Sequence, residues 1–408
     1  MDKKILLIGT LDTKGKEFGY LKASIEAAGL QTMVMDAGVL GQPSFEPDIG
    51  RSQVARAGGK DIARLIEQKD RGKSMEAMMA GVVSIARKLY DEEKISGIMG
   101  MGGGSGTNLA CAAMRALPFG FPKLVISTLA SGDTEPFIQD KDIMMLFSVA
   151  DILGLNPIIR KIISNGAAAM AGMVKANPQE TAAGKQQKER GPLISATMMG
   201  TTTDCVTFAK KIIEDKKMEI VAFAASTSGG RAMENLIGEG LVQGVLDITT
   251  TEIINTVAGG IFPASSHRFE TAGQLGLPQV LTCGAIDFVN FWTGHIPAGF
   301  ESRKFYQHNP IAVLMRTNQQ ENMEAGRVMA EKLNSSRGPV AFFIPLKGFS
   351  SYDIEGGPFY DPEADQAFIN SLEKNLRPDI KVIKCGCHIN DKQFASDMVE
   401  ALEAMMNE

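Results

Sequence analysis

Residues 5–15 read Ile-Leu-Leu-Ile-Gly-Thr-Leu-Asp-Thr-Lys-Gly, and residues 196–206 read Ala-Thr-Met-Met-Gly-Thr-Thr-Thr-Asp-Cys-Val. Each stretch is an apolar run that ends in Gly-Thr and continues through a short polar turn into a helical pattern. The same offset of 191 residues relates Gly9 to Gly200 and Gly38 to Gly229. Strand-to-helix turns are where α/β proteins place their ligands. The sequence therefore predicts two α/β domains, each with a candidate site at its first turn.

Length and composition indicate a globular protein of two domains. The chain has 408 residues, of which 44% are apolar and 22% are charged. The net charge of −5 disfavours an electrostatic nucleic-acid surface. The sequence contains neither a secretory leader nor an apolar run long enough for a membrane helix, and its five scattered cysteines favour a reducing compartment. We therefore expect a cytoplasmic protein that binds neither nucleic acid nor membranes.

Strands alternate with helical patterns along the chain, which predicts α/β folding with mostly parallel sheets and helices on both faces. The polar stretch 174–191 is the most linker-like segment, so we place two Rossmann-like domains at 1–180 and 190–408, with a cleft between them. In the first domain we expect strands at 4–9, 31–36, 95–101 and 123–127. The helices expected there are 15–28, 60–69, 75–90 and one that follows the glycine-rich segment 102–108 and ends at 116. In the second domain we expect strands at 194–199, 219–225, 244–248, 279–285, 311–315, 340–345 and 379–385. The helices expected there are 204–216, 231–238, 251–258, 319–334, 363–375 and 391–407.

The strongest local signal is a glycine-rich turn between an apolar strand and a helix. Its residues are Gly102, Gly103, Gly104, Ser105, Gly106 and Thr107. Glycines let backbone N–H groups approach an anion closely at the positive end of a helix, and two hydroxyls add further donors. The turn predicts a phosphate or carboxylate site, the alternative being a tight turn without a ligand. Its glycine spacing does not match G-x-G-x-x-G, which disfavours NAD.

Two further polar turns belong to the same domain. The turn after the first strand carries Thr10, Asp12, Thr13 and Lys14, and the turn after residue 127 carries Thr128, Ser131 and Asp133. Lys14-Gly15 reverses the Gly-Lys order of a Walker A motif, so that motif is absent. Asp12 could reach a metal ion or a ribose hydroxyl, or it could cap a helix. Because such turns meet at one edge of a parallel sheet, we expect all three to line a nucleotide site.

The second domain has a similar series of polar strand-end turns. The candidate ligand residues there are Thr201, Ser228, Gly229, Arg231, Thr250, His267, Arg268, Asp287, Lys347 and Ser350. An arginine suits a carboxylate or phosphate because its planar guanidinium can donate twice to one anion. His267 could act as an acid or base, or it could be an ordinary loop histidine. We expect a small anionic metabolite here, and no metal site, since Cys385 and Cys387 lack a second pair with zinc-ligand spacing.

Four motifs occur in the order found in one known family. They are Gly9–Glu17, Met99–Thr107, Asp247–Glu252 and Gly284–Phe291. On these motifs, essentially the whole chain resembles an uncharacterised bacterial and plant family of the UPF0261 type, which includes the plant tobamovirus-resistance protein. The resemblance implies a two-domain α/β fold, ATP binding by the first domain and a homodimer.

By this resemblance, Thr10, Asp12, Lys14 and the segment Gly102–Thr107 match the family motifs expected near ATP. Two places depart from the family pattern. Asn255 stands where relatives tend to have Asp, and Ser265–His267 replaces a Gly-Pro-Asp-like turn. A role for His267 would therefore not be shared across the family.

Three hypotheses about function remain open at this point. The first is an ATP-binding protein that acts on a small carboxylate or sugar acid, with Lys14 and Mg²⁺ neutralising phosphate charge. The second is a non-catalytic ATP sensor that recognises a protein partner. The third is a sugar-acid enzyme that uses no nucleotide and binds a substrate phosphate at the glycine-rich turn.

Overall fold

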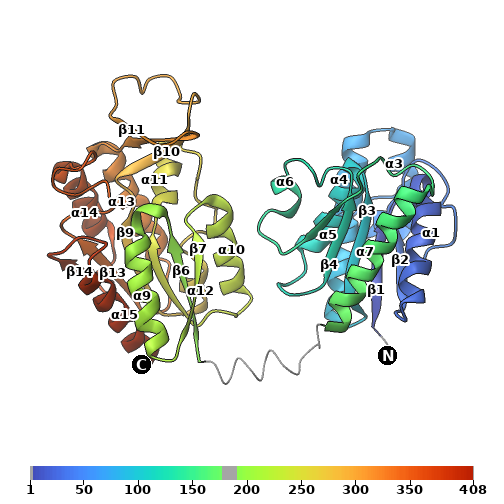
Figure 1. Ribbon diagram of the computed structural model, residues 1–408, viewed down its shortest axis with the longest axis horizontal. Helices are drawn as coiled ribbons and strands as arrows, with labels where there is room; N and C mark the ends of the chain where they lie inside the picture. Colours follow the sequence, from blue (N-terminus) through green and yellow to red (C-terminus); the bar gives the residue numbers. More distant parts are fainter. Residues whose placement is uncertain (1–2, 177–190, 408) are drawn as a thin grey trace. The chain divides into compact units, whose positions relative to one another are not determined.

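The computed structural model describes residues 3–176 and 191–407, and each part contains a parallel sheet flanked by helices (Figure 1). The chain divides into two compact units, Met1–Ala182 and Ala183–Glu408, which we call the first and second units. Most of the linker-like stretch 174–191 lies outside the described residues. Within the described ranges, none of the helices combines the length and apolar character that a membrane crossing requires.

The first unit is a five-stranded parallel sheet with helices on both faces (Figure 1). Its strands are β1 (Lys4–Gly9), β2 (Thr32–Asp36), β3 (Ile95–Gly102), β4 (Lys123–Ser127) and β5 (Met144–Phe147). Its helices are α1 (Leu11–Ala27), α2 (Arg51–Ala57), α3 (Ile62–Gln68), α4 (Arg71–Asp91), α5 (Gly104–Arg115), α6 (Glu135–Ile138) and α7 (Pro157–Ala176). The strand order β2-β1-β3-β4-β5 reverses direction between β1 and β3. Ligands of open α/β sheets bind at the carboxyl end of such a switch point.

Helix α5 packs unusually closely against the strand that precedes it. A Cβ added at Gly100 would lie 2.2 Å from the Cβ of Ala110, and one added at Gly106 would lie 2.8 Å from the carbonyl oxygen of Met101. Only glycine fits at these two positions, because any side chain would push the helix away from the strand. The N-terminus of α5 is therefore held directly at the carboxyl end of β3.

The second unit has a six-stranded parallel sheet in the order β14-β13-β9-β8-β6-β7. Its strands are β6 (Leu193–Met198), β7 (Glu219–Ala224), β8 (Gly244–Thr249), β9 (Gln279–Gly284), β13 (Val340–Pro345) and β14 (Lys381–Cys385). A 3₁₀ turn, η1 (Gly200–Thr202), precedes the helices α9 (Thr203–Asp215), α10 (Thr227–Gly238), α11 (Thr251–Val257), α12 (Thr271–Leu275), α13 (Gln319–Leu333), α14 (Pro362–Asn375) and α15 (Lys392–Asn407). The first four strands, in the order β7-β6-β8-β9, repeat the arrangement β2-β1-β3-β4. The two units therefore share one core topology.

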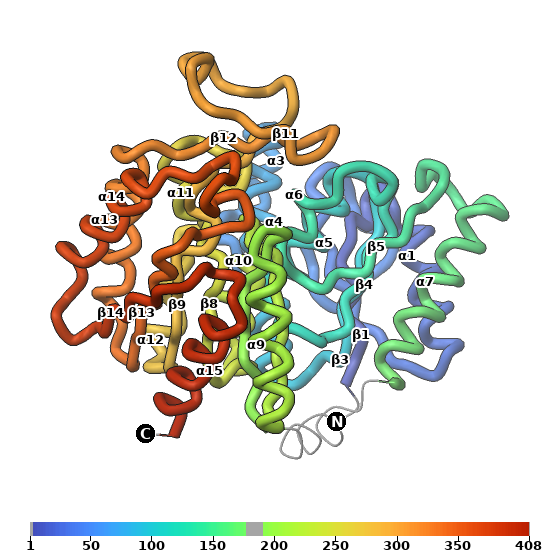
Figure 2. Tube along the Cα trace, turned by 60° about the vertical axis from the view of Figure 1, so that its left-hand side comes forward, coloured from blue at the N-terminus to red at the C-terminus, as the bar shows by residue number. Residues whose placement is uncertain are grey.

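A small antiparallel sheet is added to the second unit. It consists of β10 (Phe288–Trp292), β12 (Ala312–Arg316) and β11 (Phe305–Asn309), in that order. The connection between β10 and β11 projects from this unit in both views (Figures 1 and 2). The strand predicted at 311–315 belongs to this antiparallel sheet and not to the parallel one.

The α/β class and the mostly parallel sheets expected from the sequence are confirmed. Helix α1 begins at Leu11 and α10 at Thr227, so both start four residues earlier than predicted. Helix α2 lies in a stretch where we predicted neither a helix nor a strand. Strands β5, β10 and β11 and helices α6, α7 and α12 were not predicted either. Strand β5 is an apolar run of only four residues, too short to be assigned from periodicity, and β11 is mostly polar.

The contact between α5 and β3 predicts that Gly100→Ala destabilises the first unit by about 1–3 kcal/mol through overpacking. Gly172→Ala in α7 is the matched control, because a Cβ there meets nothing within 4 Å. The control should be neutral or stabilising by about 0.5–1 kcal/mol, as for Gly→Ala in an open helix. Hydrogen exchange of peptides from residues 3–176 in increasing urea measures this unit separately, since the one tryptophan, Trp292, lies in the second unit. Equal stability of the two variants would contradict the close contact.

Candidate functional site

A pocket of about 680 Å³ opens at the carboxyl edge of the first sheet, beside the β1/β3 switch point. This volume lies within the range of about 300–1,000 Å³ that is usual for small-molecule sites. The apolar part of its lining comes from the end of β2 and from α3, α4 and α5: Val39, Leu65, Ile66, Met75, Met78 and Leu109. The polar part comprises Thr10, Asp12, Thr13, Lys69, Asp70, Arg71, Ser74 and Ser105. The pocket therefore offers both apolar and charged side chains to a ligand.

Ser105, in the first turn of α5, lines this pocket, whereas the glycines of the same turn are not among its lining residues. The first turn of an α-helix leaves its N–H groups without intrahelical acceptors, and the helix dipole favours an anion there. Ser105 accepts a hydrogen bond at Oγ from Arg71 Nη2, 3.1 Å away, which links α5 to α4. Arg71 and Ser105 therefore lie side by side in the lining of the pocket, next to the N-terminus of α5.

Gly103 and Gly104 differ from the other glycines of this turn. Neither has a left-handed backbone, and added Cβ atoms would make only ordinary contacts, 3.6 Å from Thr128 Oγ1 and 3.9 Å from Leu129 Cδ1. Packing therefore does not require glycine at either position. A ligand that approaches the backbone closely would require it.

Lys69 ends α3 in the left-handed conformation, with φ 51°, and lines the pocket. Left-handed backbone is uncommon for a residue with a side chain and concentrates at functional sites and tight connections. Sequence reasoning missed both Lys69 and Arg71. Their only sequence signal is a short charged connection between two helical patterns, which is weak. The contact of Arg71 with Ser105 joins residues 34 apart, so no local motif reveals it.

The structure brings only part of the predicted first-domain set to this pocket. Thr10, Asp12, Thr13 and Ser105 line it. Lys14 lies elsewhere, because its Nζ donates to the carbonyl oxygen of Ile152. Thr107 is buried, and its Oγ1 forms a hydrogen bond with Ser127 Oγ at 2.7 Å.

The remaining predicted residues of the third turn lie outside the lining of the pocket. Ser131 and Asp133 are exposed, and Asp133 Oδ1 accepts from the N–H of Glu135 at 3.1 Å. Thr128 lies next to Gly103 of the glycine-rich turn. We expected three turns to line one site. The pocket is instead lined by residues of two of them, the turns after β1 and β3, together with residues of α3 and α4.

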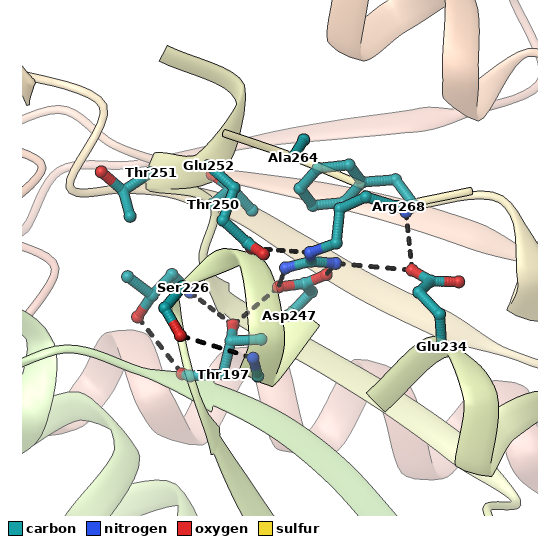
Figure 3. A network of polar contacts seen from close by, with 12 residues as sticks. Thr197, Ser226, Glu234, Asp247, Thr250, Thr251, Glu252, Ala264 and Arg268 are labelled. Atoms are coloured by element: carbon teal, nitrogen blue, oxygen red, sulfur yellow. Dashed lines mark hydrogen bonds and ion pairs between the residues drawn. The ribbon is translucent and has the colours of Figure 1, made fainter. Parts of the chain in front are cut away.

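The second unit contains a buried ionic network around Arg268 (Figure 3). Arg268 is 0% exposed, and its Nε donates to Glu252 Oε2 at 2.6 Å. Its Nη2 donates to Asp247 Oδ1 at 2.9 Å, and Nη1 lies 3.6 Å from Glu234 Oε1. The guanidinium also stacks on the ring of Phe269, 3.8 Å from its centroid. Three carboxylates and one ring therefore surround this arginine, so it anchors the loop before α12 and has no free face for a metabolite.

The three carboxylates of this network are not equally satisfied. Glu234 accepts from the N–H groups of Phe269 and Thr271, and Asp247 accepts from Thr197 Oγ1. In contrast, Glu252 Oε1 is buried and has no hydrogen-bond partner in the described part of the chain. Burial raises the pKa of Glu252 to about 7, although the charge of Arg268 opposes the rise. Glu252 therefore gains a proton at higher pH than an ordinary glutamate does.

A second buried network surrounds Arg316. Its Nη2 donates to Asp365 Oδ1 at 2.6 Å, and Ser350 Oγ donates to Asp287 Oδ2 at 2.7 Å. Burial raises the pKa of Asp287 to about 7 and that of Asp365 to about 9, and the nearby charge of Asp353 adds to both shifts. Asp287 and Ser350, both predicted ligand residues, are thus internal contacts between the loops after β9 and β13.

The other predicted second-domain residues occupy varied positions. Thr250 Oγ1 donates to the carbonyl oxygen of Thr282, and the carbonyl oxygen of Thr201 accepts from Ser351 N and Asn390 Nδ2. Gly229 packs against β7, since an added Cβ would lie 2.1 Å from the carbonyl oxygen of Ala224. The side chain of His267 is 76% exposed, Lys347 is exposed, and Ser228 and Arg231 are half-buried.

The fold and the candidate site define a Rossmann-like α/β protein with two units of related topology. Family profiles described as the N-terminal and C-terminal domains of the uncharacterised protein family UPF0261 match residues 3–179 and 191–406. The chain belongs to this family.

The chain is 47% identical to a UPF0261 protein of Clostridium tetani, with 100% of both chains covered. It is 35% identical to the ToMV susceptible protein tm-1(GCR26) of Solanum lycopersicum, over 98% of this chain and 56% of that protein. Among solved structures, the UDP-GlcNAc 2-epimerase of Methanocaldococcus jannaschii is 10% identical, with 100% of this chain and 93% of that chain covered. Its TM-score of 0.21 is too low to support an inference about activity.

The network around Arg268 predicts that Arg268→Met destabilises the second unit by about 3–5 kcal/mol, because three buried carboxylates lose their counter-charge. Arg327→Met is the matched control, since Arg327 makes only half-exposed ion pairs with Glu324 and Glu331 and should change stability little. Urea unfolding followed by Trp292 fluorescence reports on this unit. Similar midpoints for the two variants would contradict a central role for Arg268.

The raised pKa of Glu252 predicts a pH-dependent stability. Between the unfolded pKa of 4.5 and the folded value of about 7, the folded state holds more protons, so stability falls as pH rises. Glu252→Gln, which is uncharged at every pH, should reduce the decline between about pH 5 and about pH 8 by up to about 3 kcal/mol. Unfolding midpoints across this range measure the effect. Parallel declines in the variant and the natural chain would show that Glu252 does not titrate here.

Proposed function

We propose that the first unit binds a nucleoside triphosphate, with ATP and Mg²⁺ as the candidate ligands, in the pocket at the β1/β3 switch point. The observation that carries the proposal is the mixed lining of this pocket, in which apolar side chains of α3, α4 and α5 occur together with Arg71 and Ser105. A nucleotide has the same two-part chemistry, a flat base and a charged phosphate chain.

The apolar part of the lining suits a purine base. Leu65 and Ile66 come from α3, Met75 and Met78 from α4, and Leu109 from α5, so three helices contribute to it. Methionine side chains are flexible and polarisable and make favourable contacts with aromatic rings. A base in this position would exchange water for apolar contact on both faces, which is the main driving force for binding at such a site.

The polar part of the lining suits the phosphates. Phosphate oxygens accept hydrogen bonds from free N–H groups at a helix N-terminus, and the absence of side chains at Gly103 and Gly104 lets them come close. Arg71 and Lys69 supply two positive charges. The proposal therefore assigns phosphate neutralisation to these two residues and not to Lys14, whose ammonium group is engaged by Ile152.

The motifs of the family support the same location. Gly9–Glu17 and Met99–Thr107 lie on the two turns that flank the β1/β3 switch point, and residues of both line the pocket. The proposal is one of binding, and it is compatible with an ATP-consuming enzyme or with an ATP sensor.

Calorimetry with ATP, adenosine and inorganic phosphate tests the proposal. In EDTA, Arg71→Ala should weaken ATP binding by about 10- to 100-fold through loss of a charge-assisted hydrogen bond, and adenosine binding should be unchanged. Arg87→Ala, on the exposed part of the same helix and paired with Asp91, is the matched control and should bind ATP like the natural chain. No heat with ATP, or equal losses in the two variants, would overturn the proposal.

Further measurements separate the hypotheses that remain. Phosphate release during incubation with ATP and a mixture of small carboxylates identifies an enzyme, and stoichiometric binding without release identifies a sensor. Tighter binding of inorganic phosphate or sugar phosphates than of ATP would favour the sugar-acid enzyme that uses no nucleotide.

A further inference from the structure

Two carboxylates hold the turns after β1 and β2 together at the rim of the pocket. Asp12, on the first turn, accepts at Oδ2 from the N–H groups of Leu40 and Gly41, at 2.7 and 3.1 Å. Asp36, the last residue of β2, accepts at Oδ1 from the N–H groups of Leu11 and Gly38, at 3.0 and 2.9 Å. Each carboxylate thus fixes backbone of the other turn through one oxygen atom, which sets its orientation.

The second oxygen of each carboxylate is buried and unpartnered. Asp12 Oδ1 and Asp36 Oδ2 have no hydrogen-bond partner in the described part of the chain, and Asp36 is 0% exposed. Leaving one such acceptor unpaired is costly, because the carboxylate has given up water without receiving a donor. Two unpaired acceptors on neighbouring turns require a common explanation.

The two carboxylates lie close to each other. The N–H of Gly38 donates to Asp36, and a Cβ added at the same glycine would lie 2.6 Å from the Asp12 carboxylate. Gly38 therefore lies between them, and no larger residue fits there. Burial, together with the negative charge of Asp12, raises the pKa of Asp36. The guanidinium of Arg51 lowers the pKa of Asp36 through its charge, but its hydrogen bonds go to the carbonyl oxygen of Gly41 and to Gln42.

A cation satisfies both free oxygens at once and offsets their repulsion. Hard divalent cations prefer carboxylate oxygens, and Mg²⁺ in particular is usually held by one or two carboxylates together with phosphate oxygens and water. A single donor from a neutral ligand would pair one oxygen and leave the second charge uncompensated. Asp12 lines the nucleotide pocket and Asp36 directly precedes Ala37, which also lines it.

We propose that Asp12 Oδ1 and Asp36 Oδ2 are the protein ligands of a divalent cation of the Mg²⁺ class at the phosphate side of the pocket. The proposal rests on the proposed nucleotide site for its remaining ligands, a phosphate oxygen and water. Sequence reasoning considered a metal role for Asp12 alone. Asp36 was missed because an aspartate at the end of a strand is common in turns. Only the structure shows that its Oδ2 is unpartnered and that Asp12 lies nearby.

Binding of Mn²⁺, as a paramagnetic substitute for Mg²⁺, tests the site in the full chain with and without ATP. Electron paramagnetic resonance of free Mn²⁺ should show one site that tightens when ATP is added. Asp12→Asn and Asp36→Asn should each weaken Mn²⁺ binding by at least about tenfold, since each loses a charged ligand. Both variants keep an amide oxygen that can accept from the same backbone N–H groups.

Asp48→Asn is the matched control. Asp48 is an exposed carboxylate beside the same strand, and its Oδ2 accepts from the N–H of Val34 at 2.8 Å. It should bind Mn²⁺ like the natural chain. A thermal shift on addition of Mg²⁺ gives a second measure, because a cation that binds the folded chain raises its melting temperature. The natural chain and the control should show the shift, and the two site variants should not.

Folded Asp12→Asn and Asp36→Asn chains that bind Mn²⁺ as tightly as the natural chain would overturn the cation site. Absence of Mn²⁺ uptake by the natural chain, even with ATP, would also overturn it and would indicate that the two carboxylates share a proton. If Asp36→Asn fails to fold, Asp12→Asn alone decides the outcome. Calorimetry of ATP in EDTA tests the nucleotide site separately, so ATP binding without Mn²⁺ uptake rejects only the cation, and Mn²⁺ uptake without ATP binding rejects only the nucleotide.

Discussion

The direct packing of α5 on β3 determines the geometry of the carboxyl edge of the first unit. Because Gly100 and Gly106 leave no side chain between helix and strand, α5 begins immediately where β3 ends. Its first N–H groups are then brought to the same edge as the turn after β1, which is the next strand in the sheet. The glycine-rich turn thus contains two kinds of glycine, one that packing requires, Gly106, and the pair Gly103 and Gly104, at which packing does not require glycine.

The two units share a strand order but use their charged residues differently. In the first unit, Lys69 and Arg71 line a pocket, and Asp12 and Asp36 each keep one oxygen unpaired beside it. In the second unit, Arg268 and Arg316 are buried among carboxylates that belong to the same fold. Buried charges of this kind hold loops in one arrangement and are costly to expose. The arginines of the second unit are thus engaged by internal ion pairs, although Glu252 Oε1, Asp287 Oδ1 and Asp353 Oδ1 also lack a hydrogen-bond partner in the described part of the chain.

The sequence was sufficient to predict the central strands, because strands buried on both faces are continuous apolar runs, as in residues 4–9 and 95–101. It also located the two turns at the switch point, since polar residues after such strands must lie at one edge. Strand β5 was missed although its four residues are apolar, because periodicity cannot assign so short a run, and β11 was missed because most of its residues are polar.

The partners of charged side chains were harder to predict. The contact of Arg268 with Asp247 joins residues 21 apart, and that of Arg71 with Ser105 joins residues 34 apart, so neither is visible as a local motif. Arg268 was expected to be a ligand residue because arginine often is one, and only its burial identifies it as an anchor. Lys14 was expected at the phosphates because it lies on the turn after the first strand. Its position in the sequence does not determine where its side chain points, and its Nζ donates to the carbonyl oxygen of Ile152.

The central claim is that a nucleotide occupies the pocket between α3, α4 and the N-terminus of α5. Hydrogen exchange of the full chain with and without saturating ATP and Mg²⁺ tests it most directly, because it locates the ligand without a mutation. The account predicts slower exchange in peptides that cover residues 65–75 and 102–107, with no change in the second unit. Slower exchange confined to the second unit, or unchanged exchange at both pocket segments while ATP is bound, would contradict it.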